Sequence, residues 1–184
     1  MSRNPFAFLR RKSLVLLAGG VISVSMGGAV SAITSKNFIY ETERNGFYSI
    51  HAMAMAPDDG STAYVISWPG SVLSTSSSNC FNTGLHLPQG AEIKNVRAYY
   101  SSNSQSNFGV AIARITLATG ASVFLASQTV IDDSNTRTAV TLQTLAGQSK
   151  VNNNTYAYGF GVCIGPGTYF YGARILYKYD RAGA

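Results

Sequence analysis

After residue 32 the chain consists of short runs in which apolar and polar residues alternate, and no long stretch has the 3.6-residue apolar period of a helix. A period of two places successive side chains on opposite faces of a strand. Turn-forming residues separate the runs, as in Pro57–Ser61, Pro88–Gly90, Ala118–Gly120 and Asp132–Asn135. This spacing predicts an all-β protein, a single antiparallel β-sandwich that is jelly-roll-like and has about eight to ten strands.

The alternation also predicts which side chains share a face. In Ala91–Tyr100, residues Val96, Ala98 and Tyr100 lie on one side, and Asn95, Arg97 and Tyr99 lie on the other. In Asn107–Ile115, residues Phe108, Val110 and Ile112 share a face. Further strands are predicted near Tyr48–Met55, Thr62–Trp68, Phe81–Leu87, Ala121–Ile131 and Arg137–Leu145, with two more within Thr155–Tyr179. The segment Ile33–Asn45 is weakly patterned and is interpreted as an arm or an edge strand.

The N-terminus has the three parts of a secretory signal peptide. A basic start with Arg3, Arg10, Arg11 and Lys12 precedes an apolar run, and small residues follow at "VSA". We expect cleavage after Ala32, so that residues 1–32 are removed and residues 33–184 form one β-sandwich domain with no stable membrane span. An uncleaved anchor is the alternative, although glycine and serine dilute the apolar run. The paired arginines leave both the general secretory and the twin-arginine routes open.

The net charge of the mature chain differs from that of the full chain. The full chain carries +6, but four of its bases lie in the leader, so the mature chain carries +2. No basic stripe remains, and we expect no nucleic-acid partner. The expected location is secreted, that is extracellular or periplasmic.

The mature chain has two cysteines, Cys80 and Cys163. In an exported protein an even count predicts one disulfide. Two free buried thiols are the alternative.

The most aromatic stretch, Thr155–Tyr179, predicts a hairpin turning at "GPG". In an even register, Phe160 lies opposite Ala173, a large residue against a small one. In the first strand the bulky face is Tyr156, Tyr158, Phe160, Val162 and Ile164, and in the second it is Tyr169, Tyr171, Ala173, Ile175, Tyr177 and Tyr179.

Two observations bear on which face of this stretch is buried. The bulky face carries no charge, whereas the other carries Arg174 and Lys178, which favours the bulky face inside. Cys163 lies on the smaller face, and a disulfide between sheets would turn that face inward. The aromatic face would then be an exposed binding or assembly surface.

Catalytic groups are sparse. The mature chain has two histidines, His51 and His86, both in alternating apolar runs, and it has no Gly-x-Ser-x-Gly elbow. The acid pairs Asp58-Asp59 and Asp132-Asp133 are interpreted primarily as turn-forming residues. A structural calcium site at either pair is the alternative. We assign no catalytic residue, metal ligand or cofactor, and we expect no enzyme; a hydrolase is the least favoured alternative.

The segment "LPQGAEIKNVRAYYSSNSQSNFGVAIARI" (Leu87–Ile115) resembles a pattern in uncharacterised bacterial secreted β-sandwich, jelly-roll-like domains. Its form is Leu-Pro-x-Gly-Ala-x-Ile, a strand ending in Tyr-Tyr, a polar loop, and a strand ending in Arg-Ile. The closing "FYGARILYKY" resembles the last strand of such domains. The resemblance implies the fold and export, and transfers no functional residue.

Tyrosines beside polar loops favour a non-catalytic module that binds a glycan or the cell envelope, because sugar rings stack on aromatic faces. The candidate ligand-binding residues are Tyr99, Arg97 and Asn103, whereas Trp68 is assigned to the core. A structural or self-associating extracellular protein is the alternative, and the oligomeric state is left open.

Overall fold

The computed structural model describes residues 38–60, 63–67, 70–74, 78–103, 105–133, 135–144 and 147–182. The compact unit considered below spans Tyr40–Ala182, whereas the other unit, Met1–Ile39 with Gly183, lies almost wholly outside the described residues. The expected leader and its cleavage site, residues 1–32, also lie outside them, as does Trp68. No helix in the described ranges is long and apolar enough to cross a membrane.

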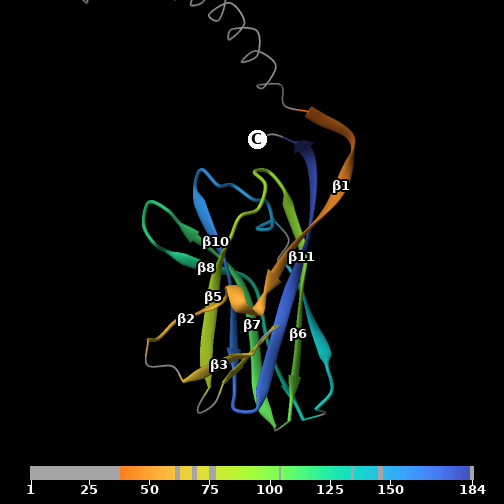
Figure 1. Ribbon diagram of the computed structural model, residues 1–184. Coiled ribbons are helices and arrows are strands. Elements are labelled where there is room, and N and C mark those ends of the chain that lie inside the picture. Colours follow the sequence, from red (N-terminus) through yellow and green to blue (C-terminus); the bar gives the residue numbers. More distant parts are fainter. Residues whose placement is uncertain are drawn as a thin grey trace, which may run out of the picture. The chain divides into compact units, whose positions relative to one another are not determined.

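The strands form two antiparallel sheets, which confirms the predicted β-sandwich (Figure 1). The six-stranded sheet has the order β3 (Tyr64–Ser67), β4 (Ser71–Ser74), β11 (Thr168–Ala182), β6 (Glu92–Ser102) and β9 (Thr138–Gln143), and β1 (Phe38–His51) also pairs with β11. The five-stranded sheet has the order β2 (Ala56–Pro57), β5 (Asn79–Leu85), β10 (Tyr156–Ile164), β7 (Ser106–Thr116) and β8 (Ser122–Asp132). A 3₁₀ turn, η2 (Ala52–Ala54), follows β1.

From β4 onward the chain changes sheet at every connection except the β7–β8 hairpin, which is a jelly-roll pattern. The short strands β2 and β4 lie outside the predicted runs. The weakly patterned segment before Asn45 becomes part of β1 from Phe38 onward.

The core lies between the sheets, and the predicted alternation places its residues correctly. In β6, Val96, Ala98 and Tyr100 are buried while Arg97 is exposed. Phe108 in β7 stacks on Tyr100 with ring centroids 4.2 Å apart, so the two sheets meet through aromatic rings. Further ring contacts join Phe108 to Phe170 and Phe160 to Phe170.

The predicted hairpin at "GPG" is wrong. Phe160 lies opposite Thr83 and Ile112 within the five-stranded sheet, whereas Ala173 lies opposite Ala98 in the other sheet. The turn at Gly165–Gly167 therefore carries the chain from one sheet to the other. A hairpin would put the two apolar faces side by side on one sheet, whereas this crossing packs them against each other.

The bulky face of β10 is buried, as favoured above, but the faces of β11 change along the strand. Phe170 and Ala173 are both buried although their positions differ in parity. The cause is a β-bulge, since Phe170 pairs with Tyr100 and Gly172 pairs with Tyr99, which leaves Tyr171 as the extra residue. Tyr169 and Tyr171 are therefore not on the buried face, contrary to the prediction.

The predicted disulfide between Cys80 and Cys163 is confirmed. The two residues lie directly opposite each other on β5 and β10, within one sheet. Cys163 is exposed and points away from the core, which excludes the alternative of a bridge between the sheets.

Candidate binding face on the six-stranded sheet

Two of the three predicted ligand-binding residues lie together on the outer face of β6. Arg97 and Tyr99 are two residues apart, so their side chains leave the same side of the strand. The Cζ atom of Arg97 lies 5.5 Å from the centroid of the Tyr99 ring. Asn103 is exposed beyond the end of β6, where its N–H donates to the carbonyl of Gly167 at 3.2 Å. Asn103 does not line the hollow that contains the other two.

That hollow has a volume of 510 Å³ and lies where β6 meets β9. Ala139 pairs with Tyr99, so a small side chain stands beside a large ring. Arg137 and Thr138 complete the lining from the start of β9.

A second hollow, of 460 Å³, shares Arg137 with the first. The bulge in β11 turns Tyr171 outward, where its hydroxyl forms a 2.8 Å hydrogen bond with the Ser101 hydroxyl. The Cζ atom of Arg137 lies 4.5 Å from the centroid of the Tyr171 ring. The other residues that line this hollow are His51, Ser67, Gly70 and Ser71. We call the two adjoining hollows, with all of these residues, the arginine groove.

His51 is oriented by the backbone after β1. Its Nδ1 accepts a hydrogen bond from the N–H of Met53 at 3.1 Å, which leaves Nε2 to carry the proton of the neutral ring. Gly70 makes room for the ring, because a Cβ atom at that position would lie 2.9 Å from Nε2. His51 therefore presents an N–H donor beside the second hollow.

The acidic and basic side chains that line the arginine groove are of one sign, since they are Arg97 and Arg137. Arg174 pairs directly with Arg97 across β11 and β6, and its Cζ atom lies 4.9 Å from the centroid of the Phe47 ring. Among the residues that the structure describes, no aspartate or glutamate lines the arginine groove. The ion pairs seen among the described residues, Lys94–Glu92 and Lys178–Glu43, involve none of these arginines.

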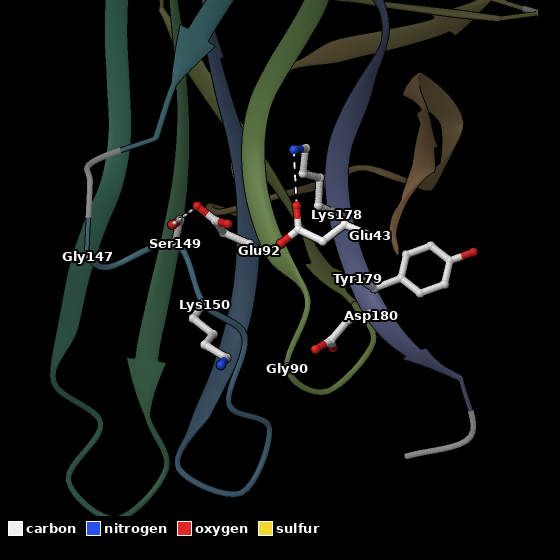
Figure 2. A pocket seen from close by; sticks show the side chains of 9 residues that line it. All are labelled: Glu43, Gly90, Glu92, Gly147, Ser149, Lys150, Lys178, Tyr179 and Asp180. Carbon is white, nitrogen blue, oxygen red and sulfur yellow. Dashed lines mark hydrogen bonds and ion pairs between the residues drawn. The ribbon is translucent and has the colours of Figure 1, made fainter. Parts of the chain in front are cut away.

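A different hollow, of 320 Å³, is lined by several charged side chains, and some of these bind one another (Figure 2). Lys178 points toward Glu43, with 3.1 Å between Nζ and Oε2, and Ser149 contacts Glu92 (Figure 2). The hydrogen bond from Lys94 is the main cause that lowers the pKa of Glu92 below its ordinary value. The described residues contain no group of three or more acidic, histidine or cysteine side chains placed to hold a metal ion.

The outer face of the five-stranded sheet is apolar instead. Its hollow of 530 Å³ is lined by small residues such as Gly159, Gly161 and Ala111, with Phe124 at its side. This face lacks charged side chains among its lining residues, so it offers little to orient a polar ligand.

Sequence reasoning missed Arg137, Tyr171 and His51. Alternation within β6 identifies Tyr99 but says nothing of which strands lie beside it. The available signal for Tyr171 was the glycine that follows it, because an isolated glycine inside a strand pattern indicates a bulge. No comparable local signal exists for Arg137, which precedes the first residue of its strand.

No family model matches the chain, and no curated protein matches its sequence. Among solved structures, it is similar to the C-terminal family 6 carbohydrate-binding module of LamC, a marine laminarinase from Zobellia galactanivorans, at 14% identity and a TM-score of 0.47. That match covers 71% of this chain and 98% of the module.

A xylan-binding module of family 15 matches at 10% identity and a TM-score of 0.48, covering 72% and 97% of the two chains. A carbohydrate-binding module of Cellvibrio mixtus lichenase 5A, in complex with cellotriose, matches at 11% identity and a TM-score of 0.40, covering 70% and 95%. At these values the likenesses carry no argument about ligand or site residues, and the sandwich fold stands on the strand pairing described above.

Proposed function

We propose that the protein is a secreted, non-catalytic module that binds a glycan or the cell envelope through the arginine groove. The observation that carries the proposal is a pair of tyrosine rings, Tyr99 and Tyr171, held on one outer sheet face beside adjoining hollows. The apolar face of a sugar ring stacks on an aromatic ring, while hydroxyl groups bond to polar neighbours. Asn103, at the end of β6, would extend the site.

Neighbouring side chains contact both tyrosines in the structure without a ligand. Tyr171 is held by its hydrogen bond to Ser101 and by the stacked Arg137. Tyr99 extends from the interior of a long strand and has Arg97 over its ring. Side chains that are already immobilised lose less entropy on binding, which favours affinity.

Secretion rests on two features. The leader pattern predicts export, and the disulfide is of a kind that persists in oxidising compartments. Mass spectrometry of the secreted chain should give an N-terminus at Ile33 and a mass two hydrogens below that of the reduced form. An N-terminus at Met1 would contradict the leader.

The test of binding is a glycan array followed by affinity electrophoresis with wild type, Tyr99→Ala and Tyr171→Ala. Each variant should lose about tenfold or more in affinity, because a buried stacking contact is removed. Tyr156→Ala is the matched control, since Arg114 lies 4.5 Å from the Tyr156 ring in the other sheet. Equal binding by all four proteins, with all four folded, would show that this face is not the site.

A second candidate function, self-association, is favoured by strand β8. This eleven-residue strand is the last in its sheet, so none of the described strands pairs with one side of its backbone. Residues 122–131 include no charged residue and no proline, the usual protections of an exposed edge. Phe124 and Ile131 are 63% and 68% exposed. We infer that a second copy could pair with this edge and continue the sheet.

Sedimentation velocity across a wide concentration range tests this pairing. A dimer should form at high concentration, and Ser127→Lys should abolish it by placing an exposed charge in the middle of the edge. Thr141→Lys on β9, the edge strand of the other sheet, is the matched control and should leave the dimer intact. A monomer at every concentration would rule out the pairing.

A further inference from the structure

Three guanidinium groups are gathered on one face, and within the described part of the chain none of them forms an ion pair with an acidic side chain. Arg97 and Arg174 lie directly opposite each other on β6 and β11. Arg137 lies just before β9, the other neighbour of β6, and lines both hollows of the groove. Each of the three stacks on an aromatic ring instead of a carboxylate.

This arrangement costs free energy in the unliganded protein. Like charges directly opposite on neighbouring strands destabilise a sheet. Two lysines of the same sheet differ, because Lys94 and Lys178 each have a glutamate within 3.1 Å. A ligand that brings negative charge to Arg97 and Arg174 would relieve their repulsion on binding.

The groove also offers donors of the right kind. A guanidinium that lies over a ring still has N–H groups at its edges, and these can donate to two oxygens at once. His51 adds an N–H, since its Nδ1 already accepts from the backbone. A ring face beside several donors suits a sugar that carries acidic oxygens.

We propose that the arginine groove selects glycans that bear carboxylate or sulfate groups. Arg97 and Arg137 in the groove, with Arg174 beside Arg97, bind the acidic groups, and Tyr99 and Tyr171 stack on the sugar rings. This rests on the proposed function, because it names the class of glycan for the same face. Carboxylate and sulfate present the same paired oxygens to a guanidinium, and the experiment below separates them.

The test uses the full mature chain and polysaccharides in matched pairs, measured by affinity electrophoresis and calorimetry. Polygalacturonate is compared with its fully methyl-esterified form, and dextran sulfate with dextran. The protein should bind at least one anionic member and bind its neutral partner about tenfold or more weakly. Binding to polygalacturonate alone assigns carboxylate, and binding to dextran sulfate alone assigns sulfate.

Variants connect the preference to the groove. Arg97→Ala and Arg137→Ala should each weaken anionic binding about tenfold or more, the loss of a charge-assisted hydrogen bond. Arg137→Lys keeps the charge but loses the paired donors, so it should restore only part of the affinity. Arg44→Ala is the matched control, because Arg44 is exposed, stacks on Tyr40 and lies outside the groove lining. Thermal unfolding checks that each variant is folded.

The outcomes separate this inference from the proposed function. Equal binding of neutral and anionic members would overturn the charge preference and leave glycan binding in place. No binding to any glycan would overturn both. Equal weakening by Arg44→Ala and Arg137→Ala, or equally tight binding of duplex DNA, would indicate a general charge effect and also overturn the inference.

Discussion

The disulfide between Cys80 and Cys163 gives the sharpest prediction about stability. Both residues are replaced by serine, which removes the covalent link and keeps side chains of similar size. Cys163 is exposed and Cys80 is half-buried, so little packing is lost. The strands that carry them remain paired on both sides of the bridge, from Ile164 opposite Asn79 to Tyr158 opposite Leu85. Removing the bridge should therefore destabilise the protein mainly by raising the conformational entropy of the unfolded chain.

The size of the effect follows from the length of the closed loop. The two cysteines are 83 residues apart in sequence. Opening a loop of that length returns about 15 cal/mol/K of entropy to the unfolded chain, which is about 4.5 kcal/mol at 25 °C. Domains are usually stable by about 5–15 kcal/mol, so the variant should lose about 30% or more of its free energy of unfolding.

Urea unfolding followed by circular dichroism measures the change. The midpoint should fall, and the slope of free energy against urea should rise, because the unlinked chain exposes more surface when it unfolds. Wild type treated with reductant is the control, and it should unfold like the double variant. A loss below about 1 kcal/mol with an unchanged slope would refute the reasoning that the bridge acts on the unfolded state.

Three further predictions concern the bulge, the core and pH. Gly172 has φ of 147°, and an added Cβ would lie 2.6 Å from a backbone carbonyl oxygen of β1. Gly172→Ala should therefore lower the free energy of unfolding in urea by about 2 kcal/mol or more. A neutral effect would argue against the bulge. Phe160 is buried, so Phe160→Ala should lower the free energy of unfolding by about 3–5 kcal/mol. Phe124 is exposed, so Phe124→Ala should change it by less than about 0.5 kcal/mol. The hydrogen bond from Lys94 lowers the pKa of Glu92 in the folded protein. The ionised Glu92 therefore adds to the free energy of unfolding above the ordinary pKa of 4.5, and this addition is lost as the pH falls through the folded pKa. Glu92→Gln should therefore be slightly less stable than wild type at pH 7, and the difference in the free energy of unfolding should narrow as the pH falls below 4.5. A difference that is independent of pH would contradict this.

Local alternation was enough to assign faces within single strands. In β6, the positions of Val96 and Arg97 follow from the two-residue period alone, because each peptide turns the next side chain to the opposite side. The same local reasoning placed Tyr99 on the outer face and favoured the core for Phe160, which is buried.

Predictions made from the alternation of a single strand were wrong where strand pairing or a β-bulge determined the structure. The turn at Gly165–Gly167 has the composition of a hairpin, yet it joins two sheets, because strand partners are chosen by packing over the whole domain. The bulge at Tyr171 shifts the parity of β11, and only the ladder with β6 reveals it.

The sequence by itself determined the all-β class, the pairing of the two cysteines and the outward direction of Arg97 and Tyr99, because each depends on composition or on a two-residue period. Only the tertiary structure decided that Arg137 and Tyr171 meet those residues on one face. Contacts between residues far apart in the chain depend on which strands become neighbours, and that choice is made by burying the apolar faces of both sheets together. The arginine groove is a consequence of that burial, formed on the side of the sheet that the core leaves exposed.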